Sequence, residues 1–290
     1  MHLPPLGLYI HLPWCERKCP YCDFNSHEAI AIPEDDYVRA LLQDLRHELP
    51  LLQQRRVETL FIGGGTPSLF SAGSIRRLLQ GIADLAELSP TLEATMEANP
   101  GSAEAEKFIA FREAGINRLS IGIQSFSDAQ LQALGRVHTS DQALAAIEFA
   151  RRADFESINL DLMHGLPGQT AKNAQLDLEC AIAFGPAHLS WYQLTIEPNT
   201  AFYKRSPVLP DEDELADIQQ LGEQLLAASG YAQYEVSAYS KPGFNCRHNQ
   251  NYWSFGDYLG IGAGAHGKVT LSDGRIQRYA KRRQPQDYLS

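Results

Sequence analysis

Three cysteines stand close together near the start of the chain. Cys15, Cys19 and Cys22 form a CxxxCxxC motif directly after the apolar segment Leu6 to Leu12. Three thiolates at this spacing can bind three corners of a cubane iron–sulfur cluster and leave its fourth iron without a protein ligand. The motif therefore predicts a [4Fe-4S] cluster with one iron open for chemistry.

The same loop has a second interpretation, a structural zinc ion. Such an ion takes four ligands, and three cysteines completed by His11 or His27 are an accepted set. Zinc sites usually show paired CxxC units, which this loop lacks, so the cluster is the favoured prediction. Arg17 and Lys18 inside the loop would partly offset the negative charge of a thiolate-bound cluster.

A glycine-rich turn and three polar side chains follow other short apolar segments. The turn is Gly63-Gly64-Gly65-Thr66-Pro67, and the side chains are Glu97, Gln124 and Asp161. Without Cβ atoms, the backbone of such a turn can approach a small polar ligand and offer its N–H groups. Taken singly, these features fit an ordinary turn, a helix cap or a surface charge equally well. Together they place one distinctive group at the same end of successive strands, where parallel barrels bind their ligands.

The elements that must position these residues follow an alternating pattern. Short β-branched segments alternate with longer segments of helical period, as in parallel βα units. The predicted strands are Leu6 to Leu12, Val57 to Ile62, Leu92 to Glu97, Arg118 to Ile123, Ser157 to Met163 and His188 to Leu194. The predicted helices are Asp35 to Leu52, Ser74 to Leu88, residues 103–114, Asp141 to Ala153 and Asn173 to Phe184.

This order predicts an α/β fold, a partial (β/α)6 TIM-like barrel over residues 1–197. The rhythm changes near Pro198, where prolines are followed by a predicted helix at Asp211 to Ser229 and a predicted strand at Tyr234 to Tyr239. We therefore expect a C-terminal α+β extension over residues 198–290. The chain stops at Ser290 without the signals of a finished domain, so we expect the extension to be truncated.

Composition excludes several classes of protein. The 290 residues carry a net charge of -10, which argues against nucleic acid as a partner, because phosphate binding needs clustered Lys and Arg. No apolar segment approaches the roughly 18 residues that a membrane-spanning helix needs. The five cysteines, three of them clustered, do not resemble a secreted disulfide framework and favour a reducing compartment. We expect a cytoplasmic protein, and its oligomeric state stays open.

With these residues assembled, the sequence resembles the radical S-adenosylmethionine (SAM) superfamily, and within it the oxygen-independent coproporphyrinogen III dehydrogenase branch. The likeness runs from Leu6 to Tyr279 and includes the CxxxCxxC loop, GGGTP, Glu97 to Pro100 and Gly122 to Phe126. The resemblance implies that SAM chelates the open iron. One electron then cleaves the sulfonium into methionine and a 5′-deoxyadenosyl radical.

The resemblance also implies which residues hold SAM. Carried over by position, they are Tyr9, Gly64, Glu97, Gln124, Arg136 and Asp161, with Gly65 and Thr66 close to a second SAM. A carboxylate suits the ribose hydroxyls or the ammonium group of methionine, and an arginine suits its carboxylate.

Two functions compete within this branch, a heme chaperone and a dehydrogenase that oxidatively decarboxylates coproporphyrinogen III. The dehydrogenases carry a further cysteine where this chain has Phe24, and an N-terminal extension ahead of the cluster loop. His248, Tyr252 and Trp253 form a stretch similar to the HNxxYW heme-binding motif of the chaperones. We therefore expect no coproporphyrinogen dehydrogenase activity, and a chaperone that binds the cluster, SAM and heme. Its expected partners are heme-accepting respiratory proteins, with peripheral membrane association through them.

Overall fold

The predicted strands are all present in the fold. The computed structural model of the protein describes residues 2–101 and 105–290. The strands are β1 (Leu6–Leu12), β4 (Val57–Gly64), β5 (Leu88–Ala98), β6 (Arg118–Gln124), β7 (Ser157–His164) and β8 (His188–Gln193). Each pairs in parallel with the next, so the predicted series of βα units is confirmed.

Helices connect these strands and cover the outer face of the sheet. The main ones are α1 (Glu34–Leu52), α2 (Ala72–Leu85), α4 (Phe108–Ala114), α6 (Ser140–Arg152), α7 (Ala171–Ala183) and α9 (Glu212–Ala228). Helices α6 and α7 begin with capping boxes on Thr139 and Thr170, whose side chains accept hydrogen bonds from backbone amides in the first turn. The predicted helix over residues 103–114 is confirmed from Phe108, while residues 103 and 104 lie outside the described residues.

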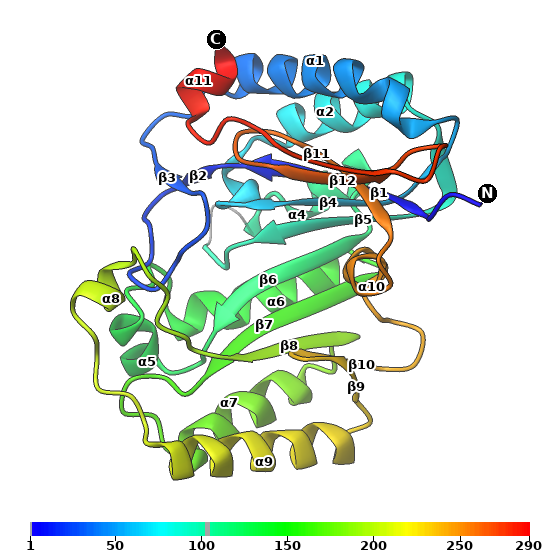
Figure 1. Ribbon diagram of the computed structural model, residues 1–290. Coiled ribbons are helices and arrows are strands. Elements are labelled where there is room, and N and C mark those ends of the chain that lie inside the picture. The colour runs from blue at the N-terminus through cyan, green and yellow to red at the C-terminus, as the bar shows by residue number, and fades with distance from the viewer. Residues whose placement is uncertain (1, 102–104) are drawn as a thin grey trace.

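Within the described residues, one 11-stranded sheet has the order β13-β12-β11-β1-β4-β5-β6-β7-β8-β10-β9. Figure 1 shows it curving into an open barrel, with α1 and α2 outside one end and α7 and α9 outside the other. Strand alternation explains this arrangement. On β1, Leu6, Leu8, Ile10 and Leu12 are fully buried in the core that packs on the helices, which leaves Tyr9 and His11 on the inner face. Each such leucine or isoleucine contributes about 1.5–3 kcal/mol by burial.

The C-terminal segment adds strands to both edges of the same sheet. At one edge lie β9 (Ala232–Glu235) and β10 (Ala238–Ser240). The prediction of a single strand over Tyr234 to Tyr239 is wrong, because a turn at residues 236–237 folds this stretch into an antiparallel hairpin. A division of the chain at 197/198 remains our proposal.

At the other edge, β11 (Asp257–Ile261) pairs in parallel with β1, and β12 (His266–Thr270) and β13 (Ile276–Ala280) continue it antiparallel. The buried Asp257 carboxylate holds this edge together, because it accepts hydrogen bonds from the Arg55 guanidinium (2.7 Å), the Lys268 ammonium (3.0 Å) and the Thr270 amide (2.8 Å). The remaining short elements are β2 (Trp14–Cys15), β3 (His27–Glu28), η1 (Pro67–Leu69), α5 (Asp128–Ala133), α8 (Ala201–Lys204), α10 (Arg247–Trp253) and α11 (Pro285–Leu289). None of the helices in the described ranges combines the length and apolar character that a membrane crossing requires.

Candidate functional site

The cysteine loop lies at the carboxyl end of β1, at the open end of the barrel (Figure 1). All three residues are free cysteines. Cys15 is buried, and Cys19 and Cys22 are half-buried. Burial raises the pKa of the Cys15 and Cys22 thiols. A bound cation would offset this effect, because metal coordination deprotonates a thiol. Three thiols around one cavity, with no fourth cysteine among its described lining residues, fit a cluster that keeps one open iron.

Of the two histidines proposed for the zinc alternative, His11 is engaged elsewhere, whereas the buried Nε2 of His27 has no hydrogen-bond partner among the described residues. His11 donates from Nε2 to the Asn25 carbonyl (2.8 Å) and accepts at Nδ1 from the Tyr9 hydroxyl (2.9 Å). Burial lowers the pKa of His11, so the ring is neutral at pH 7. His27 lies on β3, next to Trp14 in the β2–β3 pairing.

A cavity of about 280 Å³ joins the cysteine loop to the ends of β4, β5, β6 and β7. It is lined by the three cysteines and by seven of the residues predicted to hold SAM, namely Gly64, Gly65, Thr66, Glu97, Gln124, Arg136 and Asp161. Residues up to 177 positions apart in the sequence, from Cys15 to Tyr192, thus share one cavity. Tyr9 differs from the other SAM predictions, because its ring lies in a second cavity described below.

Two buried carboxylates line the smaller cavity and repel each other. Glu97 accepts a hydrogen bond from the Gly64 amide (3.2 Å), and Asp161 accepts from the Ser120 hydroxyl (2.9 Å) and the Asn159 amide (2.8 Å). Burial, followed by repulsion from Asp161, raises the pKa of Glu97 to about 7. Burial also raises the pKa of Asp161. Two carboxylates that resist ionisation favour a ligand that brings positive charge or hydroxyl donors.

Arg136 connects the cysteine loop to β6 and to the residue that follows β5. Its guanidinium donates to the Asn99 side chain (2.8 Å) and the Gly122 carbonyl (3.0 Å), and also to the Cys19 sulfur (3.6 Å). Its buried Nε has no partner among the described residues, so a donor remains for a ligand carboxylate.

Gln124 is held in a backbone conformation that non-glycine residues rarely adopt. Its φ is 67°, and its side-chain carbonyl accepts a hydrogen bond from the Tyr192 hydroxyl (2.8 Å). Strain of this kind costs of order 1–3 kcal/mol and persists where the surroundings fix it, often at functional sites.

The glycine turn positions the cysteine loop. Its amides at Gly65 and Thr66 donate to the carbonyls of Leu12 (2.8 Å) and Trp14 (2.7 Å), and its third amide, at Gly64, is bonded to Glu97. A Cβ atom at Gly65 would lie 2.4 Å from the Trp14 carbonyl oxygen, so only glycine allows this approach. These three amides are therefore engaged within the protein and hold the loop, and the contact of Gly64, Gly65 and Thr66 with SAM stays a prediction.

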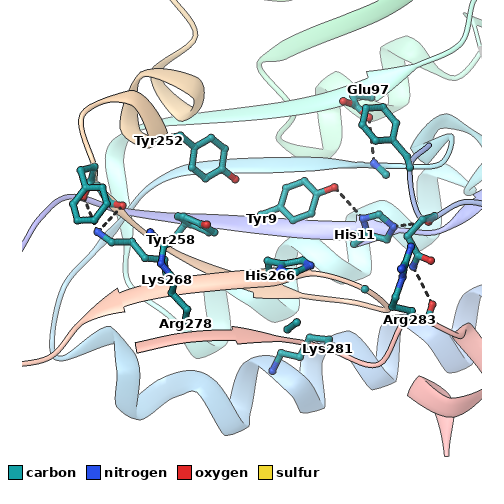
Figure 2. A pocket seen from close by; sticks show the side chains of 17 residues that line it. Tyr9, His11, Glu97, Tyr252, Tyr258, His266, Lys268, Arg278, Lys281 and Arg283 are labelled. Carbon is teal, nitrogen blue, oxygen red and sulfur yellow. Dashed lines mark hydrogen bonds between the residues drawn. The ribbon is translucent and has the colours of Figure 1, made fainter. Parts of the chain in front are cut away.

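A second, larger cavity of about 800 Å³ adjoins the first and shares Phe24, Gly64 and Glu97 with it. Its volume lies within the range of roughly 300–1,000 Å³ that small-molecule sites occupy. Figure 2 shows Tyr9 from β1, Tyr252 from α10 and Tyr258 from β11 around it, with His266 and basic side chains from β12, β13 and the segment after them. Its aromatic walls suit a flat, apolar ligand.

The three residues of the HNxxYW stretch occupy different environments. Tyr252 lines the larger cavity. His248 is fully buried behind it, with Nδ1 hydrogen-bonded to the Thr59 hydroxyl and Nε2 to the Tyr252 hydroxyl (both 2.8 Å). Trp253 is 64% exposed and donates to Glu235 (3.1 Å). Burial lowers the pKa of His248 to about 3, so its imidazole is neutral and supports the phenol.

Several side chains of the smaller cavity were not found from the sequence. They are Tyr21, Ser26, Asn99, Ser120 and Tyr192. Asn99 stands inside the Glu-Ala-Asn-Pro motif, and Ser120 has the same strand parity as Gln124, so period-two alternation could have placed both. Glu93 was also missed, although its carboxylate accepts hydrogen bonds from the first amides of α10 (3.0 and 3.1 Å).

Comparisons with known proteins agree with this geometry. The family model described as the radical SAM superfamily matches residues 9–180. The heme chaperone HemW of Escherichia coli (strain K12) is 57% identical over 288 residues, which are 99% of this chain and 76% of that protein. The heme chaperone HemW of Bacillus subtilis (strain 168) is 40% identical over 280 residues, 93% of this chain and 74% of that protein. The chain belongs to the HemW family of the radical SAM superfamily.

A solved structure supports the fold of this HemW family member. The coproporphyrinogen III oxidase HemN from Escherichia coli, described as a radical SAM enzyme, superposes with a TM-score of 0.85 at 27% identity. The match covers 99% of this chain and 69% of that one. The α/β partial barrel predicted from the sequence is thereby confirmed. Membership of the superfamily implies a [4Fe-4S] cluster and SAM as cofactors.

Proposed function

We propose that this protein is a heme chaperone that binds a [4Fe-4S] cluster, SAM and heme and delivers heme to respiratory proteins. The observation that carries the proposal is the pair of adjoining cavities, one lined by three thiols and one large and aromatic. The names of its HemW relatives support the same function.

The smaller cavity is the proposed site of the cluster and SAM. Cys15, Cys19 and Cys22 would hold the cluster, whose open iron supplies a ligand position for SAM and one-electron chemistry. Glu97 and Asp161 would pair with the cationic and hydroxyl groups of SAM. The Arg136 guanidinium would receive a carboxylate and also lower the negative charge at Cys19.

The larger cavity is the proposed heme site. Tyr9, Tyr252 and Tyr258 offer aromatic surface to the porphyrin, and the shared residues Gly64 and Glu97 bring the two cavities into contact. His248, Tyr252 and Trp253 are the proposed heme contacts, and their positions give them different roles. Tyr252 would touch heme directly, while His248 would act through its hydrogen bond to Tyr252 unless α10 moves.

A protein that delivers heme to respiratory proteins must be able to reach them, and we propose that it does so from the cytoplasm. The reducing environment that the cysteines need is found there. Contact with membrane-bound recipients would give peripheral membrane association without a membrane-spanning helix in this chain's described part.

The decisive experiment is anaerobic reconstitution followed by heme titration and a coproporphyrinogen III turnover assay on one sample. We expect cluster absorbance, stoichiometric heme binding and no formation of protoporphyrinogen IX. A colourless sample that contains zinc in place of iron after reconstitution would contradict the cluster assignment. Cluster formation without heme binding would contradict the chaperone.

The second candidate is oxygen-independent coproporphyrinogen III dehydrogenation, favoured by the superposition with HemN. The residue that argues against it is Phe24, which borders both cavities where the dehydrogenases of this branch carry a cysteine. Turnover of coproporphyrinogen III by the reconstituted protein would establish this candidate in place of the chaperone.

A further inference from the structure

The larger cavity is lined by a histidine, His266, that lies outside the HNxxYW motif. His266 begins β12 and is exposed, although the residues on either side of it, Ala265 and Gly267, are buried. Its side chain lines the cavity, and in Figure 2 it lies on the β12 wall below Tyr9. No described residue forms a hydrogen bond or ion pair with this ring, so a nitrogen lone pair is available to a ligand.

The register of the edge strands explains why His266 faces inward. His266 pairs with Ala280 and Lys268 with Arg278, while Lys268 also pairs with Tyr258 on β11. All five side chains line the cavity, which is the alternation expected of one sheet face. A Cβ atom at Gly260 would lie 1.9 Å from the His266 carbonyl oxygen. The strand β11 must therefore have a glycine, without a side chain, where it passes His266.

Most of the other imidazole and phenol side chains around the cavity are already engaged, with the Tyr258 hydroxyl as the exception among the described residues. Both His11 nitrogens are hydrogen-bonded, and so are both nitrogens of the buried His248. The hydroxyls of Tyr9 and Tyr252 are the partners of these two rings. A tyrosine must also lose a proton with an ordinary pKa near 10 before it binds iron as phenolate, whereas a neutral imidazole binds as it is.

Of the basic side chains that line the cavity, some are paired with carboxylates and others are not. The ammonium of Lys268 is neutralised by Asp257, and that of Lys281 by Asp44 and Glu48. Arg278 and Arg283 also line the cavity, are exposed, and have no carboxylate partner among the described residues. Two guanidinium groups without carboxylate partners, one on β13 and one in the segment after it, suit the carboxylates of a dianionic ligand.

We propose that His266 is the axial ligand of the heme iron in the larger cavity, with the porphyrin carboxylates held by Arg278 and Arg283. This inference rests on the proposed function, heme binding in the same cavity. It assigns the ligand to β12 and leaves Tyr252 and His248 as contacts that shape the opposite wall.

The first test compares heme with metal-free protoporphyrin IX in the full chain. His266→Ala and the closer-sized His266→Gln should weaken heme binding at least roughly tenfold and change the Soret and visible bands, since an iron bond is lost. Binding of metal-free protoporphyrin should stay within about twofold, because it has no iron to ligate. Added imidazole should restore the heme spectrum of His266→Ala. His47→Ala, an exposed histidine on α1, is the matched control and should behave as wild type.

Each outcome decides one claim. Wild-type protein that binds no heme overturns the proposed function itself. Heme binding that persists in both His266 variants with an unchanged spectrum overturns the ligand assignment alone. The ligand assignment is also overturned if Tyr252→Phe or His248→Ala changes the Soret and visible bands of bound heme while the His266 variants leave them unchanged. Equal loss of heme and metal-free porphyrin would mean that His266 only shapes the wall.

The second test concerns the carboxylates. Wild-type protein should prefer heme to heme dimethyl ester by roughly tenfold, because esterification removes two charge-assisted contacts. The double variant Arg278→Gln, Arg283→Gln should bind both with similar affinity. A preference that survives in the double variant would overturn the role of these arginines.

Discussion

Glu97 allows the electrostatics of the smaller cavity to be tested without any cofactor. Its carboxylate is crowded by Asp161 and removed from bulk water, and its folded-state pKa is about 7 against an ordinary value of 4.5. The substitution Glu97→Gln removes the charge and keeps a carbonyl oxygen that can accept the Gly64 amide. It therefore isolates the cost of ionising this group inside the barrel.

The sign follows from proton binding. Between pH 4.5 and pH 7 the folded protein holds a proton on Glu97 that the unfolded chain has released, so stability falls as pH rises through this window and is level above it. With these two pKa values, the wild type loses about 2.5 kcal/mol between pH 5 and pH 8 through this one group. Glu97→Gln cannot ionise at this position, so its stability does not fall in this way.

The assay is denaturant unfolding of the cofactor-free, reduced protein at pH 5 and pH 8. The stability of Glu97→Gln relative to wild type should rise by about 2 kcal/mol or more between the two pH values. Glu87→Gln, at an exposed ion pair with Arg56, serves as the control and should show no such change. A Glu97→Gln difference that is the same at both pH values would refute the reasoning that the carboxylate is forced to ionise against its surroundings.

Three further substitutions probe the cysteine loop, the motif helix and the sheet edge. Cys15→Ala should abolish the iron content and the brown absorbance after anaerobic reconstitution, whereas Cys180→Ala on α7 should retain both, as iron analysis will show. Glu93→Gln should lower the free energy of unfolding by roughly 1 kcal/mol, measured by denaturant titration, because a charged acceptor at the start of α10 becomes neutral. Asp257→Asn should cost about 3–5 kcal/mol in the same assay, because it leaves the Lys268 ammonium buried without a counter-charge.

Controls separate these effects from general damage. Asp273→Asn removes a carboxylate from an exposed pair with Arg275 and should leave the melting temperature unchanged. If Asp257→Asn melted like Asp273→Asn, the buried pair would not hold the β11–β12 edge. Iron retained in Cys15→Ala at the wild-type level would exclude this thiol from the cluster. A Glu93→Gln protein as stable as wild type would mean that α10 does not depend on its cap.

The barrel strands could be predicted because each contains a short, largely buried apolar segment and is followed by a segment long enough for a helix. β11 could not. It is five residues long, lies between Gly256 and Gly262, and pairs with a strand about 250 positions earlier, a contact for which no local pattern exists. The hairpin at β9 and β10 was missed for a related reason, since an alternating segment does not reveal the turn inside it.

The members of the smaller cavity could be gathered from the sequence because parallel strands deliver their carboxyl ends to one edge. The sequence could not show which way individual side chains point. His248 looks like an exposed ligand in a polar motif, but the Thr59 hydroxyl and the tight approach of Gly7 enclose its ring. His266 carried no motif, and only the pairing register shows that it faces the larger cavity. What these residues bind stays a prediction for the tests above.

The pairing of β1 with β11 also bears on synthesis. During translation the first strand has its partner β4 within about 50 residues, but its other hydrogen-bonding edge stays bare until residue 261 has left the ribosome. An uncovered strand edge is a template for aggregation, so a chain cut at residue 197 should be far less soluble than the full chain. The wall that carries His266 forms last, which means that a nascent chain can assemble its cysteine loop before it can enclose a porphyrin.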